Sequence, residues 1–180
     1  MTMEFDNYTV RQVRMDDLSD YFSMIETNRP RLNDFFAGTM AMTRTLEETS
    51  DHLADVIAKA EKNNYFPFVV VDNNTNRVIG SIQVKNIDWT IPKAELGYYI
   101  DEQYGGKEIT TRAVALIIDF CFKELNLNKL YLRTHEENIP SRKVAEKNGF
   151  SVEGVIRRDY KTTGGGIVDL MYYGLLNPNT

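Results

Sequence analysis

Alternating or short apolar stretches recur along the chain and predict six β-strands. They cover residues 8–14, 66–71, 78–84, 94–100, 129–134 and 168–175. The polar run DNNTN at 72–76 separates the second and third stretches. A run of Asp and Asn between two apolar segments is typical of a hairpin turn, so these two strands are expected to be antiparallel neighbours.

Apolar residues spaced three and four apart predict helices in the first third of the chain. Asp16 is expected to cap a helix that continues until Pro30 interrupts it. Residues 31–38 (RLNDFFAG) then predict a short helix that ends at Gly38. The sequence Thr-Leu-Glu-Glu at 45–48 has the form of a capping box and predicts the start of a longer helix.

Two further helices are predicted in the second half of the chain. From Thr110 to Leu125 the apolar period changes to that of a helix. Pro140 stands where the last helix begins, and Asn148 with Gly149 ends it, which is the usual placement of Pro at a helix start and Gly at its end. Most strands precede these late helices, so the pattern predicts an α+β or mixed α/β fold.

The length and composition favour one ordinary folded domain over residues 1–180. Hydrophobic residues make up 42% of the chain and charged residues 26%, which excludes a disordered or collagen-like protein. No apolar run approaches the roughly 20 residues of a membrane span, and the acidic N-terminus does not resemble a secretory signal. Cys121 is the single cysteine, which suits a reducing compartment, so we expect a cytoplasmic protein.

The formal net charge of −5 bears on possible partners. An acidic chain with a pI near 5.1 is not expected to bind nucleic acid directly, and it mildly favours a cationic partner. With two histidines and one cysteine, no metal site is expected.

The segment QYGGKEIT at 103–110 is the first candidate for binding chemistry. A Walker loop would need a glycine at Asp101 and a Ser or Thr at Glu108, and the glycine spacing of a dinucleotide fingerprint is absent. What remains is a strand, a run of bare amides and a helix start, which together form an anion cradle. The alternative is a plain tight turn with Gly105 in the left-handed conformation.

Four segments taken together resemble the GNAT acetyltransferases, and specifically the RimJ/RimL branch that acetylates the N-termini of ribosomal proteins. They are KAELGYYI at 93–100, NIPSRKVAEKNGF at 138–150, EKNGFSVEGVIRRDY at 146–160 and DLMYYGLL at 169–176. Their order and spacing cover nearly the whole chain. The resemblance implies the acyl-CoA N-acyltransferase fold, a mostly antiparallel central sheet flanked by helices, with acetyl-CoA as the co-substrate.

The resemblance also implies which residues contact acetyl-CoA. The backbone of Tyr98, Tyr99 and Ile100 would pair with the pantetheine arm and supply oxyanion donors. The pyrophosphate cradle would contain Gln103, Gly105, Gly106, Lys107, Glu108, Ile109 and Thr110. Glu108 breaks the family pattern of Gly or Ala, so its carboxylate is expected to point away from the phosphates.

Three residues are the candidates for catalysis. Many family members carry a proton-donating tyrosine where this chain has Ala145, whereas the RimL-like branch uses a serine, which Ser141 matches. Asn138 is the asparagine of the same Asn-x-x-Ser motif. The alternative for Ser141 is a first-turn helix residue that hydrogen-bonds local backbone, and the alternative for Asn138 is a helix cap. Glu95 is the leading candidate for a base acting through water, with an ion-paired structural carboxylate as the alternative.

A further glutamate used as a base in the RimL-like branch is absent. Tyr160 takes its place, with Asp159 beside it. Tyr98 is expected to be a tunnel wall. Residues expected to be structural are His52, His135 and Cys121, and residues expected either in the core or along an acceptor groove are Phe35, Phe36, Met40 and Met42.

These observations predict an acetyl-CoA-dependent N-acetyltransferase, expected to be a homodimer, whose acceptor is a primary amine. The α-amine of a protein or peptide, such as a ribosomal protein, is the first choice, because no strong base is evident and an α-amine has a pKa near 8. Small amines such as polyamines or aminoglycosides are the second choice. A catalytically silent acyl-CoA-binding sensor or scaffold is the alternative from another class.

Overall fold

One continuous eight-stranded sheet organises the computed structural model, which describes residues 1–178. The strand order is β1-β2-β3-β4-β5-β6-β8-β7, and every neighbouring pair is antiparallel except β5 and β6. The strands are β1 (Thr2–Phe5), β2 (Tyr8–Gln12), β3 (Phe66–Asp72), β4 (Arg77–Asp88), β5 (Lys93–Ile100), β6 (Lys129–Thr134), β7 (Ser151–Lys161) and β8 (Ile167–Leu176). The predicted mixed α/β class with a mostly antiparallel sheet is confirmed.

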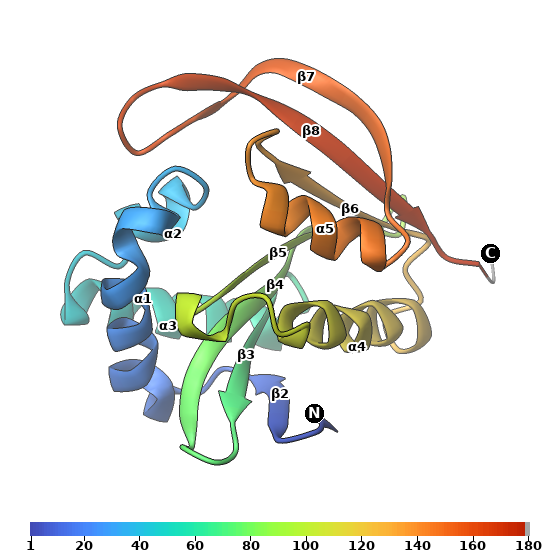
Figure 1. The fold of residues 1–180 in the computed structure, drawn as a ribbon. Coiled ribbons are helices and arrows are strands. Elements are labelled where there is room, and N and C mark those ends of the chain that lie inside the picture. The colour runs from blue at the N-terminus through green and yellow to red at the C-terminus, as the bar shows by residue number, and fades with distance from the viewer. Residues whose placement is uncertain (179–180) are drawn as a thin grey trace.

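Helices cover both faces of this sheet (Figure 1). They are α1 (Leu18–Leu32), α2 (Ala37–Ala41), α3 (Leu46–Glu61), α4 (Ile109–Lys123) and α5 (Ile139–Lys147), with short 3₁₀ turns at Met15–Asp17 and Glu102–Tyr104. Helices α4 and α5 contribute to one hydrophobic core, and α1 and α3 contribute to the other.

Strand β3 lies between the two cores, and this position explains why its sequence is apolar from Phe66 to Val71. Phe68 and Val70 belong to the core under α4, whereas Val69 and Val71 belong to the core under α1 and α3. Since successive side chains point to opposite faces of a strand, a strand covered on both faces needs apolar residues throughout.

The segment between α1 and α3 differs from the prediction. Pro30 does not interrupt α1 but lies inside its last turn, and the predicted helix over 31–38 is wrong, because α2 begins only at Ala37. Pro30 is exposed, so the carbonyl that loses its helical donor can be hydrated. The predicted cap at Asp16 is also displaced: Asp17 caps α1 and pairs with Arg11 at 2.6 Å.

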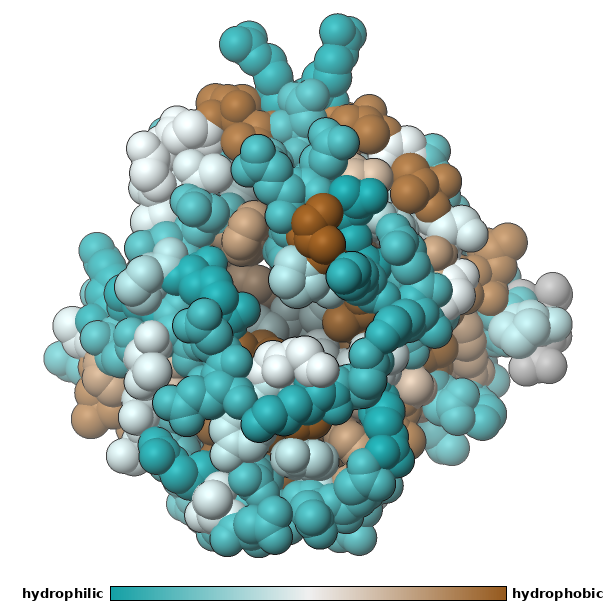
Figure 2. All heavy atoms as spheres, in the orientation of Figure 1, coloured by the Kyte–Doolittle hydropathy of each residue, from teal (hydrophilic) through white to brown (hydrophobic). Residues whose placement is uncertain are grey.

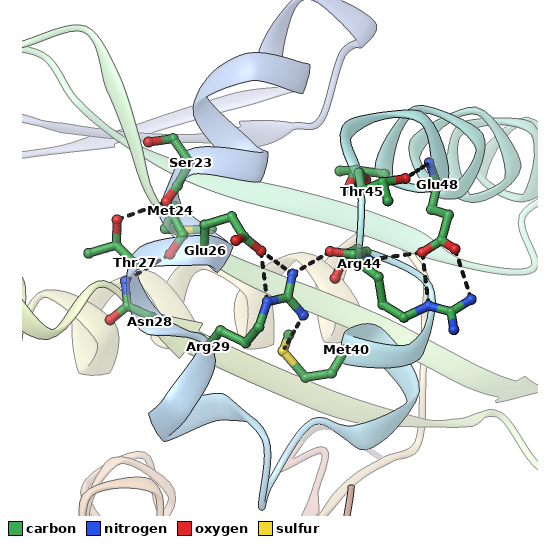
Figure 3. Close-up of polar contacts among 12 residues, drawn as sticks. Ser23, Met24, Glu26, Thr27, Asn28, Arg29, Met40, Arg44, Thr45 and Glu48 are labelled. Atoms are coloured by element: carbon green, nitrogen blue, oxygen red, sulfur yellow. Dashed lines mark hydrogen bonds and ion pairs between the residues drawn. The ribbon is translucent and has the colours of Figure 1, made fainter.

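Arg29 ties the end of α1 to the segment that follows it (Figure 3). Its guanidinium donates to Glu26 Oε1 at 2.7 Å, to the Thr43 carbonyl and to Met40 Sδ at 3.7 Å. The predicted start of α3 at Thr45 is confirmed, since Thr45 Oγ1 accepts from the Glu48 amide at 3.1 Å, whereas the Glu48 carboxylate accepts from the Arg44 amide at 3.0 Å. These contacts hold residues 33–43 against the body of the protein.

Strands β1 and β7 have no counterpart in the sequence-based prediction. In β7 nearly every residue is exposed, including Val152, Val155 and Ile156. A strand without one buried face lacks the alternating pattern by which strands are recognised. Figure 1 shows β7 and β8 as a long hairpin that reaches toward α2.

The core under α4 provides a stability test. Ile117 is fully buried there, so Ile117→Ala should lower the free energy of unfolding by about 2–5 kcal/mol. Ile91 is 56% exposed, and Ile91→Ala should change it by no more than about 0.5 kcal/mol. Chemical denaturation of both variants would measure the difference, and equal effects would contradict this assignment of the core.

Candidate functional site

The site begins where β5 and β6 separate. β5 pairs with β6 only through Lys93, Ala94 and Glu95, whereas it pairs with β4 as far as Ile100. The edge of β5 that faces β6 is therefore without a strand partner from Leu96 onward. Backbone N–H and C=O groups on such an edge can bind an extended ligand as an added strand.

Two cavities meet at this opening. The first, of about 210 Å³, lies between β5, β6, the segment 34–39 and the β7–β8 hairpin, and the second lies toward Ile100 and Thr110. Figure 2 shows a hollow at the centre of this face of the molecule, with apolar residues inside it. The residues that line both cavities are Phe35, Phe36, Tyr98, Asn138 and Ser141.

The side chain of Tyr98 joins β5 to the first turn of α5. Its hydroxyl donates to the Ser141 carbonyl at 2.8 Å and lies 3.4 Å from Ser141 Oγ. Burial raises the pKa of Tyr98 well above its usual range, so the hydroxyl stays protonated. The side chain of Tyr98 was predicted to form a tunnel wall; the structure places its hydroxyl beside the candidate proton donor.

Asn138 is the cap of α5. Its Oδ1 accepts from the Ser141 amide at 3.3 Å, which orders the first turn of the helix. Four residues beyond Ser141, Ala145 is completely buried in the core. The position where many family members carry a tyrosine therefore offers no hydroxyl here, and Ser141 is the hydroxyl that this helix presents to the cavities.

Tyr99 points to the opposite side of β5. Its hydroxyl donates to Tyr21 Oη at 2.8 Å, and its ring packs edge-on against Phe36 with centroids 4.9 Å apart. Phe35 and Phe36 line the cavities, whereas Met40 is buried in the core and Met42 is exposed. The predicted alternatives for these four residues therefore do not apply to all of them alike: Met40 belongs to the core, Phe35 and Phe36 line a cavity, and Met42 lies on the surface.

The loop after β5 presents backbone amides at the start of α4. Asp101 Oδ1 accepts from the Gln103 amide at 3.0 Å, and the Gly105 amide bonds the Glu102 carbonyl. Gly106 is the left-handed glycine with φ of 72°, so the alternative that placed Gly105 in that conformation is wrong. The first-turn amides, from Ile109 on, have no acceptor within the helix.

The space above this loop is open. A Cβ added at Gly106 would meet no atom within 4 Å, so the backbone there is accessible to a ligand. Lys107 lies close by, with its Nζ 5.3 Å from the Tyr104 ring centroid. Arg112, in the first turn of α4, is paired with Asp6 near β1.

Glu108 turns toward α5. It caps α4 in the left-handed conformation with φ of 60°, and its carboxylate pairs with Lys147. The hydrogen bond from Lys147 lowers the pKa of Glu108. No sequence pattern indicated this partner, because the two residues are 39 positions apart.

Glu95 is the last residue of β5 that pairs with β6, and it is only 4% exposed. Its carboxylate accepts from Asn86 at 2.7 Å and from Arg133 at 3.1 and 3.2 Å, and Lys85 Nζ lies 3.7 Å away. It lines the first cavity. The structure therefore places Glu95 in the wall of the first cavity, within an ion-pair network.

The hairpin completes this network. Arg133 lies 3.6 Å from Asp159 and donates to Tyr172 at 3.5 Å, and the Tyr172 hydroxyl donates to Asp159 at 2.8 Å. Tyr160 lines the first cavity and accepts from the Ala37 amide at 2.7 Å.

His135 was expected to be structural, yet it lines the first cavity. Its Nδ1 accepts from the Glu137 amide at 3.3 Å. Its position directly after a strand parallel to β5 could have signalled this, because side chains that follow parallel strands meet at one edge of the sheet. The other histidine, His52, lies away from both cavities, and burial lowers its pKa.

The remaining candidates agree with structural roles. Cys121 is fully buried, which raises the pKa of its thiol to about 12.

Within residues 1–178, no group of three or more His, Cys, Asp or Glu side chains could hold a metal ion. Over the same range, none of the helices is both long and apolar enough to cross a membrane.

Comparison with known proteins shows which family this chain resembles in sequence and fold. The model of the acetyltransferase (GNAT) domain matches residues 7–151. The spermidine N(1)-acetyltransferase of Escherichia coli K12 is 36% identical over 85 residues, which cover 47% of this chain and 46% of that protein.

Two solved structures share the fold over nearly their whole lengths. The ribosomal-protein-S5-alanine acetyltransferase of Vibrio fischeri has a TM-score of 0.91 at 28% identity, covering 99% of this chain and 98% of that one. RimL, a ribosomal L7/L12 α-N-protein acetyltransferase in complex with coenzyme A, has a TM-score of 0.92 at 16% identity, covering 98% of each chain. With the domain match spanning most of its length, the chain belongs to the GNAT acetyltransferase family.

Proposed function

We propose that this protein transfers the acetyl group of acetyl-CoA to the N-terminal α-amine of a protein, with ribosomal proteins as the leading candidates. The observation that carries the proposal is the meeting of two cavities at Tyr98 and Ser141. A donor on one side and an amine on the other would meet there, beside two hydroxyl groups. The proposal takes residues 1–180 as one catalytic domain.

The residues around the second cavity fit acetyl-CoA. The edge of β5 at Tyr98–Ile100, which has no strand partner, can pair with the amide groups of the pantetheine arm. The open backbone at Gly106 and the start of α4 suit a pyrophosphate, because helix N-termini carry partial positive charge. The proposed cradle contains Gln103, Gly105, Gly106, Lys107, Glu108, Ile109 and Thr110; Glu108 contributes backbone only, since its carboxylate is held by Lys147.

Acetyl-CoA supplies the acetyl group as a thioester already activated toward an amine. The chain then has to hold the two reactants close together, stabilise an oxyanion and provide a proton. Backbone N–H groups on the free edge of β5 are the proposed oxyanion donors. Ser141 Oγ is the proposed donor of the proton that the departing thiolate gains as the carbon–sulfur bond breaks and the amide bond forms, and Tyr98 holds Ser141 in place.

The amine must lose a proton, and we propose that water in the first cavity carries it away. An α-amine with a pKa near 8 is roughly a tenth neutral at pH 7, so a weak base suffices. Glu95 lines this cavity, but its contacts with Asn86 and Arg133 favour its alternative role as an ion-paired structural carboxylate. In this proposal Glu95 fixes the cavity wall and orders the water.

The charges of the first cavity favour a monoamine over a polyamine. Asp34 and Glu95 line it together with two cations, Lys85 and Arg133. A site for a polycation needs an excess of carboxylates, which this wall does not supply. The net charge of −5 favours basic protein partners, and the ribosomal acceptors named for two structural relatives agree with this choice. The spermidine acetyltransferase, matched over about half the chain, keeps small amines as the second candidate.

The proposal extends to assembly and location. Exposed apolar side chains on the hairpin, Val155, Ile156 and Ile167, offer a surface for a second copy of the chain, which supports a homodimer. The cytoplasm is the proposed compartment, because the single cysteine is a buried free thiol.

The cradle is tested by a matched pair of substitutions. Asn and Asp both tolerate the left-handed conformation of Gly106, but only Asp repels phosphate. Gly106→Asp should abolish acetyl-CoA binding measured by calorimetry, and Gly106→Asn should weaken it less, with similar melting temperatures for both. Binding like the wild type in both variants would move the cradle elsewhere.

The role of Ser141 is tested by its loss. Ser141→Ala should lower kcat about ten- to a thousandfold with little change in acetyl-CoA affinity, since general acid help is worth about 10²–10⁴ and water can replace part of it. Ser151→Ala, at an exposed serine outside both cavities, is the control. Full kcat in Ser141→Ala, with chemistry shown to be rate-limiting, would reduce Ser141 to a helix-start residue.

The acceptor is tested with a panel of amines. Peptides with a free N-terminus should be acetylated there, and blocking that amine should abolish transfer. The rate should rise with pH as the α-amine loses its proton, and it should fall with salt if charge steers association. Mass spectrometry locates the acetyl group; preference for spermidine, or modification of blocked peptides at lysine, would overturn the α-amine assignment. Acetyl-CoA binding without transfer to any amine would favour the silent sensor.

A further inference from the structure

An irregularity in the β7–β8 hairpin lies directly over the first cavity. Ile156 pairs with Leu170 and Tyr160 pairs with Val168, so residues 157–159 of β7 face Asp169 alone. Arg158 adopts the left-handed conformation with φ of 55°, and its amide donates to Asp169 Oδ1 at 2.8 Å. Such bulges occur next to active sites, where they change the direction of a side chain.

The bulge directs two consecutive side chains into contacts below the hairpin. Asp159 accepts from Tyr172 and lies 3.6 Å from Arg133, whose guanidinium lines the first cavity. Tyr160 reaches further and accepts from the Ala37 amide at the start of α2. At the tip of the hairpin, Thr163 Oγ1 donates to the Asn33 carbonyl at 2.6 Å.

Tyr160 therefore connects two walls of the acceptor cavity. Among the described lining residues, only Tyr160 and Leu170 come from the hairpin, whereas Phe35, Phe36 and Thr39 come from the segment on the other side. The hydrogen bond to Ala37 fixes the distance between these walls. A large ring held at both ends limits the space left for a substrate group.

We propose that Tyr160 determines the acceptor's size: the cavity admits an amine on a small residue, such as glycine, alanine or serine, and excludes one on a bulky residue. This inference rests on the proposed N-terminal acetylation and adds a selectivity to it. Tyr160 acts as a wall, and the reacting atoms lie toward Tyr98 and Ser141. A pocket of this kind discriminates about 10- to 200-fold per methylene group.

The experiment compares peptides that differ only in their first residue, alanine against leucine. In the wild type, kcat/KM should be higher for the alanine peptide. Tyr160→Ala should lower that ratio at least tenfold, mainly because the leucine peptide gains through a lower KM. Acetyl-CoA affinity, measured by calorimetry, should not change.

Two further variants distinguish the role of Tyr160 as a cavity wall from a general effect on the fold. Tyr131→Ala removes a half-buried tyrosine of β6 that lines a different groove, and it should leave the ratio unchanged. Tyr160→Phe keeps the ring but loses the acceptor of the Ala37 amide, so it should keep the preference while hydrogen exchange at Ala37 becomes faster.

Opposite results would overturn the inference. They are an unchanged ratio in Tyr160→Ala, an equal shift in Tyr131→Ala, or unchanged exchange at Ala37 in Tyr160→Phe. If no peptide is acetylated, the proposed function fails, and alaninamide against leucinamide then tests Tyr160 on its own. If no amine reacts at all, exchange at Ala37 decides whether Tyr160 joins the two walls.

Discussion

The parting of β5 from β6 after Glu95 is the constraint on which the site depends. Glu95 is nearly inaccessible to water, and a buried carboxylate costs several kcal/mol unless it is paired. Arg133, two positions beyond the last residue of β6 that pairs with β5, supplies the partner, and Asn86 supplies a further donor. This ion pair joins the two strands where their backbone pairing ends. It therefore fixes the point at which β5 and β6 begin to separate.

The parallel direction of β5 and β6 brings two helix starts to the same opening. Chains leaving parallel strands emerge at one edge of a sheet, so α4 begins near Gly106 and α5 begins at Asn138 on the same side. The Tyr98 hydroxyl then links β5 to the first turn of α5. The second cavity is therefore bounded by free strand backbone and helix N-termini, which suits an anionic, amide-rich ligand.

The β7–β8 hairpin supplies one wall of the first cavity through Tyr160 and Leu170. Little of β7 is buried; beyond its pairing with β8, it contacts the body through Glu153, which pairs with Lys129 of β6, and the hairpin adds contacts from the bulge and the tip. Asp159 adds to the same Arg133 network that holds β5 and β6 together. The Arg133 guanidinium thus connects the ion pair at the strand opening with the hairpin that walls the first cavity.

The sequence determined the local elements and the order of motifs. The capping box at Thr45, the α5 start at Asn138 and the glycine loop were recognised because their signals lie within a few consecutive residues. Tertiary structure alone decided that Glu108 faces Lys147, that Gly106 is the left-handed glycine, and that His135 and Tyr160 line a cavity. The Glu108–Lys147 pair and the lining of the cavity depend on residues far apart in the chain, which no local pattern reveals. β7, which carries Tyr160, is exposed on both faces and therefore lacks the periodic signal by which a strand is predicted.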